Sequence, residues 1–83
     1  MSKKYIISIT DYSYRFSYTT FIGKGTYVFQ GEKYRVLANR DQAQIYTSLN
    51  RAKAAIERIR KSDCVNVPYL AEKYTIMQAE VSE

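Results

Sequence analysis

The most regular hydrophobic pattern in the chain lies between Leu49 and Ile59. Leu49, Ala52, Ile56 and Ile59 recur at spacings of three, four and three residues, and Ala55 falls on the same side. Residues spaced in this way share one face of an α-helix, because the helix turns by about 100° per residue. The pattern therefore predicts an amphipathic helix with one buried face.

The residues around this pattern indicate where the helix begins and ends. Ser48 stands where an N-cap is needed, because its hydroxyl can accept a hydrogen bond from a backbone N–H one turn later. Arg60 and Lys61 fall in the last turn, where positive charge suits the negative end of the helix dipole. We expect the helix to span residues 48–61.

Alternating apolar and polar residues predict strands on both sides of this helix. In residues 4–10, Tyr5, Ile7 and Ile9 would share one face, and Ile6 would make the other face apolar as well. This strand is therefore expected inside the sheet and not at its edge. Three more strands are expected, at residues 26–30, 34–37 and 74–81, and residues 43–46 can add a short one. The polar break at residues 30–33 contains one glycine and lets residues 34–37 return antiparallel to residues 26–30.

The stretch from Asp11 to Thr20 alternates more strictly than any other part of the chain. Tyr12, Tyr14, Phe16 and Tyr18 occupy every second position, with polar residues between them. A period of two predicts a strand with one aromatic face and one polar face. Gly23 and Gly25 follow, and this glycine pair predicts a hairpin turn that needs positive φ.

Together these elements predict a single α+β domain over residues 1–83. Its sheet would be antiparallel, with four or five short strands and the one helix packed across a face. The last strand can lie beside the first, because the intervening helix returns the chain to its starting end. A chain of 83 residues forms one core, and that core needs the helix and the sheet together.

Composition narrows the range of partners. The formal net charge is +5, which favours anionic partners and excludes a protein that mimics DNA with acidic residues. A net charge of this size is also explained by solubility alone. The single cysteine, Cys64, cannot form an intramolecular disulfide, so we expect a reducing, cytoplasmic location. We also expect no signal peptide and no membrane-spanning segment, because the apolar runs are too short.

The residues that usually carry catalysis are scarce. The chain has no histidine to act as a general base or a metal ligand. Cys64 falls just after the predicted helix, where the helix dipole disfavours a thiolate. The eight acidic residues are scattered singly along the chain. We therefore expect a protein that is not an enzyme and that holds no cofactor or metal.

Two surfaces are candidates for binding. The first is the basic side of the helix, which is either a solvated face or a site for phosphate or an acidic protein. The second is the aromatic stripe, formed by Tyr12, Tyr14, Phe16 and Tyr18 and continued by Tyr27, Phe29 and Tyr34. The stripe is either the core beneath the helix or an exposed surface that binds a protein or stacked bases. The candidate binding residues are Tyr12, Tyr14, Arg15, Tyr18, Lys24, Arg35, Arg51 and Arg58.

Several short motifs lie along the chain: Lys4-Tyr5-Ile6-Ile7, Ala43-Gln44-Ile45-Tyr46 with Ser48, Ala52, and Ala79-Glu80-Val81. They resemble the motifs of small proteins from phages and mobile elements of Gram-positive bacteria. That group combines an extended start, an Ala-x-hydrophobic-aromatic entry to a single helix, and a terminal strand that ends in Glu-Val. Some proteins of this size and origin block host defence, anti-CRISPR proteins among them, so the resemblance implies such a role.

The sequence therefore leads to three functional expectations. The first is an inhibitory binding protein, encoded by a phage, that occupies a surface of a host protein or ribonucleoprotein complex in the host cytoplasm. The second is a basic, tyrosine-rich module that binds nucleic acid directly. The third is a protein whose partner is its own copy, in a homodimer joined through an exposed sheet edge.

Overall fold

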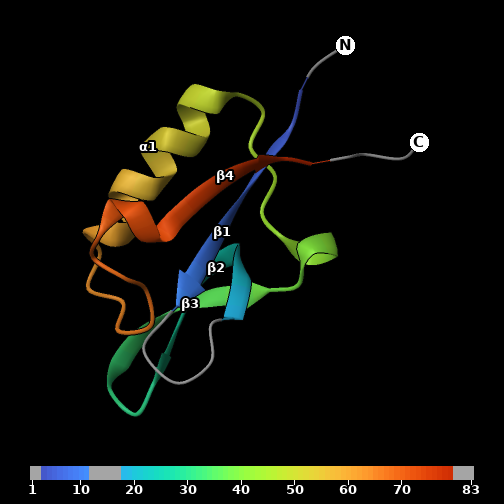
Figure 1. The fold of residues 1–83 in the computed structure, drawn as a ribbon. Coiled ribbons are helices and arrows are strands. Elements are labelled where there is room, and N and C mark those ends of the chain that lie inside the picture. Colours follow the sequence, from blue (N-terminus) through green and yellow to red (C-terminus); the bar gives the residue numbers. More distant parts are fainter. Residues whose placement is uncertain (1–2, 12–17, 80–83) are drawn as a thin grey trace.

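The computed structural model describes residues 3–11 and 18–79 and shows one sheet with one helix packed against it (Figure 1). The strands lie in the order β3-β2-β1-β4, and each neighbouring pair is antiparallel. This arrangement confirms the predicted α+β class with an antiparallel sheet and a single α-helix. The elements are β1 (Tyr5–Asp11), β2 (Tyr18–Phe29), β3 (Glu32–Ala38), α1 (Leu49–Arg60) and β4 (Tyr74–Gln78), with short 3-10 helices at Arg40–Gln42 and Ala71–Lys73.

Strand β1 lies inside the sheet, as its apolar residues on both faces predict. On one side Ser8 is opposite Phe21 of β2, and on the other side Ile7 is opposite Ile76 of β4. The expectation that the last strand pairs beside the first is therefore confirmed. Ile6 and Ile7 are almost wholly buried on opposite faces of the strand.

The core lies between α1 and the face of the sheet that carries Ile7 and Ile9. Leu49 was expected in this core, but its side chain is 41% exposed. It is the first residue of α1 and precedes by nearly a turn the first residue that packs on the sheet, Ala52. The buried cluster consists of Ile7, Ile9, Ile22 and Tyr74 from the sheet with Ala52, Ala55, Ile56 and Ile59 from the helix.

Both ends of α1 are capped where the sequence predicts. The Ser48 hydroxyl accepts a hydrogen bond from the Arg51 backbone N–H at 3.1 Å. At the other end, Lys61 is the C-cap, and the Ser62 hydroxyl donates to the Ile59 carbonyl at 2.6 Å. These bonds satisfy backbone groups that have no partner inside the helix.

The glycine pair does not form the predicted hairpin turn. Gly23 and Gly25 lie inside β2, where the pairing with β3 shifts register between Ile22 and Thr26. The chain reverses at Gln30 and Gly31, within the polar break predicted at residues 30–33, and their φ angles are 51° and 80°. Positive φ at both central residues is the geometry that a two-residue hairpin requires. The two glycines lie in this irregular part of the strand, where Gly25 has a φ of 82°.

The expected strand at residues 43–46 is reduced to a single bridge. Tyr5 donates its N–H to the Tyr46 carbonyl at 2.9 Å, and Tyr46 donates to the Tyr5 carbonyl at 2.8 Å. The Gln44 N–H also donates to the Ile22 carbonyl at 2.8 Å. The segment therefore pairs with β1 at Tyr5, on the N-terminal side of Ser8, where the pairing of β1 with β2 has ended.

A single strand from Asp11 to Thr20 is not what the structure shows. Asp11 is the last residue of β1, Tyr18 is the first residue of β2, and the two are opposite one another in the antiparallel ladder. The predictions for Tyr12, Tyr14 and Arg15 lie outside the described residues.

Candidate functional site

Two neighbouring cavities lie between α1 and the rest of the molecule. The first, here called the entry cavity, has a volume of about 410 Å³ and is bounded by residues 44–47 and by Arg51, Ala54 and Arg58 of α1. These helix residues are spaced by three and four positions, so they share one side of the helix. The segment that leads into α1 thus forms one wall of the cavity, and this side of α1 forms the other.

The second cavity, here called the hairpin cavity, has a volume of about 280 Å³. Thr26 of β2 and Lys33 and Arg35 of β3 form its sheet side, and it shares Tyr46 and Arg58 with the entry cavity. We call the two cavities together the basic groove. Arginine or lysine residues reach it from α1 and β3, and none of the described residues that line it is acidic.

The basic residues of α1 differ in what they contact. Arg60 binds Glu57 with two nitrogens, at 2.9 and 3.2 Å, and donates to the Tyr69 carbonyl at 3.0 Å. Its guanidinium also lies over the Tyr69 ring, 5.5 Å from the centroid. The hydrogen bond from Arg60 holds the pKa of the Glu57 carboxyl below its ordinary value. Arg60 therefore fastens the chain after the helix and is not available to a ligand.

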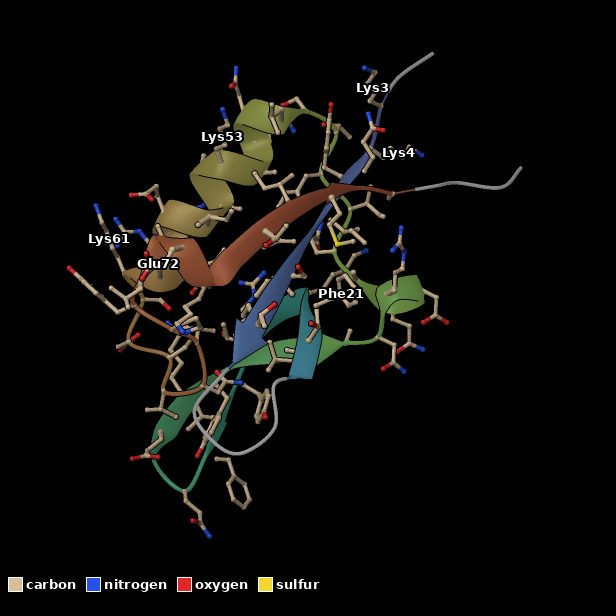
Figure 2. All side chains as sticks on the ribbon, in the orientation of Figure 1. Lys3, Lys4, Phe21, Lys53, Lys61 and Glu72 are labelled. Atoms are coloured by element: carbon tan, nitrogen blue, oxygen red, sulfur yellow. The ribbon has the colours of Figure 1, made fainter. Side chains whose placement is uncertain are left out.

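Lys53 of α1 and Lys61 at its C-cap also lie apart from the groove. Lys61 pairs with Glu57 at 3.6 Å, whereas Lys53 makes no ion pair with Glu57 among the described residues. Figure 2 shows Lys53 and Lys61 on the outer side of α1, directed away from the sheet. Of the helix cations, Arg51 and Arg58 are therefore the two that line the groove.

Arg35 is held from two directions. Its backbone N–H donates to the Asn66 side-chain oxygen at 2.9 Å, and the Asn66 amide donates to the Arg35 carbonyl at 2.9 Å. One terminal nitrogen of the guanidinium donates to the Gly23 carbonyl at 3.1 Å. The Nε atom is buried and has no acceptor among the described residues. A buried donor without a partner is uncommon in proteins and often marks a site where a ligand or water binds.

Tyr46 lies at the centre of the groove, where the two cavities meet. Burial raises the pKa of its phenol above the ordinary value of 10.0, and the positive charges of Arg35 and Arg58 oppose that rise. The hydroxyl therefore stays protonated and available as a hydrogen-bond donor across the physiological pH range. Tyr46 is thus a neutral donor in a basic environment.

The end of the hairpin between β2 and β3 exposes a second surface. Tyr27, Val28 and Phe29, here called the hairpin tip, are 49%, 71% and 58% exposed. Tyr27 stacks on Tyr34 across the hairpin, with ring centroids 5.4 Å apart and planes 11° apart. The hypothesis that the aromatic residues form the core beneath the helix is therefore wrong for Tyr27 and Phe29, because the hairpin extends beyond α1 (Figure 1).

The structure brings together three of the predicted binding residues, Arg35, Arg51 and Arg58, in the basic groove. Lys24 is exposed in the irregular part of β2 and lines neither cavity. Tyr18 begins β2, while Tyr12, Tyr14 and Arg15 are outside the described residues.

Sequence reasoning missed two residues of the groove, Lys33 and Tyr46. Tyr46 was placed in a strand by its apolar neighbours, and nothing in that pattern shows that it lines a cavity together with Arg35 and Arg58. Lys33 was placed in the polar turn before β3, but it belongs to the strand. The alternation along β3 could have identified it, because Lys33 and Arg35 are two residues apart and share one face.

Comparisons with protein-family models, with curated proteins and with solved structures found no match. Within the described residues, no group of three or more acidic, cysteine or histidine side chains is placed to hold a metal ion. No helix in the same part of the chain is long and apolar enough to cross a membrane.

Proposed function

We propose that this protein is a small, non-enzymatic binding protein that inhibits a host defence complex by occupying one of its surfaces. The observation that carries the proposal is the hairpin tip, where three consecutive large apolar residues are exposed at the end of a two-stranded projection. The two strands that carry the tip, β2 and β3, are paired up to Phe29 and Glu32.

The tip has the chemistry of a protein-binding surface. Aromatic residues dominate binding energy at interfaces, because they bury a large area at a small cost in conformational entropy. The helix α1 does not cover the ring of Tyr27 or Phe29, so both rings can enter a pocket of a partner. The choice of a defence complex as the partner rests on the resemblance of the sequence to small phage and mobile-element proteins.

Co-expression with a panel of nuclease-based defence systems tests this function. The readout is the survival of a targeted plasmid or phage, followed by a cleavage assay with the purified effector. We expect the wild-type protein to protect the target from at least one effector and to bind that effector directly. The absence of protection and binding across a broad panel would contradict the proposal.

A second candidate function is direct binding of nucleic acid through the basic groove. Arg35, Arg51 and Arg58 favour it, because they present positive charge on one surface without an acidic residue in the lining. Contacts with backbone phosphates make affinity fall steeply as salt rises. Titration of single-stranded and double-stranded oligonucleotides at two salt concentrations measures this slope. The absence of binding at low salt would contradict this second function.

A further inference from the structure

Two arginines from different elements line the hairpin cavity. Arg35 comes from β3 and Arg58 from α1, so the fold and not the local sequence brings them to one place. Like charges in a shared, partly desolvated cavity repel one another, and an anion between them removes that cost. The cavity therefore has an electrostatic preference for a negatively charged occupant.

The acidic residues near the cavity pair with cations other than its two arginines. Asp63 pairs with Lys33, a lysine of the cavity lining, at 3.5 Å, and 84% of the Asp63 side chain is exposed. Glu57 pairs with Arg60 and Lys61. Among the described residues, neither Arg35 nor Arg58 forms an ion pair with a carboxylate. The charge of the two arginines is thus not neutralised from within the described part of the chain.

The donors in the cavity match the acceptors of a phosphate group. An arginine guanidinium has five N–H donors and no acceptor, and its fork pairs with two oxygens of a phosphate at once. The structure accounts for one donor of Arg35, on the Gly23 carbonyl, and leaves its buried Nε without an acceptor. We infer that the hairpin cavity binds a single phosphate group, held by Arg35 and Arg58 with the Tyr46 hydroxyl as a further donor.

This site does not depend on the proposed role of the hairpin tip. The phosphate group comes either from inorganic phosphate or from a small phosphorylated molecule. The entry cavity adjoins the site through Tyr46 and Arg58, and its volume of about 410 Å³ leaves room for the remainder of such a molecule. Ligand pockets span about 300–1,000 Å³, so the groove is large enough for a nucleotide-sized compound.

Titration with inorganic phosphate, with chloride adjusted to constant ionic strength, tests the site. Thermal melting and the NMR signals of the arginine Nε–H groups are the two readouts. We expect the melting temperature to rise with phosphate, because a ligand that binds only the folded state stabilises it. We expect the Arg35 Nε–H signal to shift along the same binding curve. No phosphate-specific change in either readout would overturn the inference.

Matched variants locate the effect. Arg58→Gln should raise the Kd for phosphate by about tenfold to a hundredfold, the usual range for losing a charged hydrogen-bond donor. Lys53→Gln removes the same charge from the outer side of α1 and should leave the Kd unchanged. Arg58→Lys keeps the charge but loses the fork and should bind with intermediate affinity. Equal Kd values for Arg58→Gln and Lys53→Gln would contradict the site.

Three further ligands identify the source of the phosphate. Adenosine monophosphate, adenosine and sulfate are titrated beside inorganic phosphate. Equal binding of phosphate and the nucleotide, without binding of adenosine, would assign the site to the phosphate group alone. Tighter binding of the nucleotide would place its remainder in the entry cavity. If adenosine binds as tightly as adenosine monophosphate, the inference of a phosphate site is wrong. Phe29→Ser should bind phosphate normally, which separates this test from that of the hairpin tip.

Discussion

Asn66 pairs with both backbone polar groups of Arg35. Its side-chain oxygen accepts from the Arg35 N–H at 2.9 Å, and its amide donates to the Arg35 carbonyl at 2.9 Å. One side chain thus takes the place of a neighbouring strand at the outer edge of β3, beside a backbone bond from the Val65 N–H to the Lys33 carbonyl. The contact fixes the position from which Arg35 reaches the hairpin cavity.

Asn66→Asp tests this contact with almost no change in shape. A carboxylate can accept from the Arg35 N–H but cannot donate to its carbonyl, so one of two bonds is lost. We expect the free energy of unfolding to fall by about 1–3 kcal/mol, the cost of leaving a partly buried polar group without its partner. Asn66→Ala should cost at least as much. Chemical denaturation measures both values, and an unchanged stability in both variants would show that the pairing contributes nothing.

Ile56→Ala tests the core between α1 and the sheet. Ile56 is 9% exposed and belongs to the buried cluster, so its truncation should lower the free energy of unfolding by about 2–5 kcal/mol. That is a large part of the total for a domain of this size. Lys53→Ala lies on the outer side of the same helix and serves as the control. Similar melting temperatures for the two variants would contradict the packing described here.

Tyr74 makes stability depend on pH in the alkaline range. Its hydroxyl donates to the Pro68 carbonyl at 2.7 Å, and burial raises the pKa of the phenol to about 12. Because the folded pKa lies above the unfolded value of about 10, the folded state holds this proton more tightly. The contribution of this proton to the free energy of unfolding is therefore complete below about pH 10. It is lost as the pH rises to about 12, which lowers the free energy of unfolding by about 2–3 kcal/mol.

Tyr74→Phe is the variant that isolates this effect. It should be slightly less stable than the wild type at pH 7, because it lacks the hydrogen bond, and should lose less stability between pH 10 and pH 12. Tyr69→Phe, at an exposed position, should follow the wild-type curve. Urea denaturation across this pH range provides the comparison. Parallel curves for Tyr74→Phe and the wild type would exclude Tyr74 as the titrating group.

Gly23 has a steric role that the sequence pattern did not reveal. A Cβ atom at this position would lie 2.9 Å from Val36 Cγ1 and 3.0 Å from the Val36 carbonyl oxygen. Gly23→Ala should therefore destabilise the protein by about 1–3 kcal/mol, the usual cost of overpacking. Because the Gly23 carbonyl also receives the Arg35 guanidinium, the variant should weaken phosphate binding as well. Thermal melting and phosphate titration check the two effects separately.

Local patterns were sufficient for the helix and for the centre of the sheet. The spacing of Ala52, Ile56 and Ile59 and the cap at Ser48 predict α1 because they depend on neighbours within one or two turns. The reversal at Gln30 and Gly31 falls within the polar break that the sequence predicts at residues 30–33, whereas Gly23 and Gly25, which resemble a hairpin signal, form no turn. Glycine indicates unusual backbone geometry, but it does not say whether that geometry is a turn or a bulge.

The groove could be predicted only in part. Arg51 and Arg58 share one side of a helix, so their proximity follows from spacing alone. Their approach to Arg35 and Tyr46 depends on how α1 crosses the sheet and on the register shift in β2, which are set by long-range packing. The exposure of Tyr27 and Phe29 depends on how far the β2–β3 hairpin extends past the helix, and no local pattern reports that length.

The central claim is that the hairpin tip is the surface that binds the partner. The most direct test is a cleavage-inhibition assay with the effector that the wild type inhibits, comparing Phe29→Ser with Leu70→Ser. Phe29 and Leu70 are 58% and 52% exposed, so each change removes an exposed apolar side chain and should leave the melting temperature nearly unchanged. We expect Phe29→Ser to raise the inhibitory concentration by about tenfold or more, as loss of an aromatic hot spot does, and Leu70→Ser to leave it unchanged. Equal inhibition by Phe29→Ser and the wild type would contradict the claim.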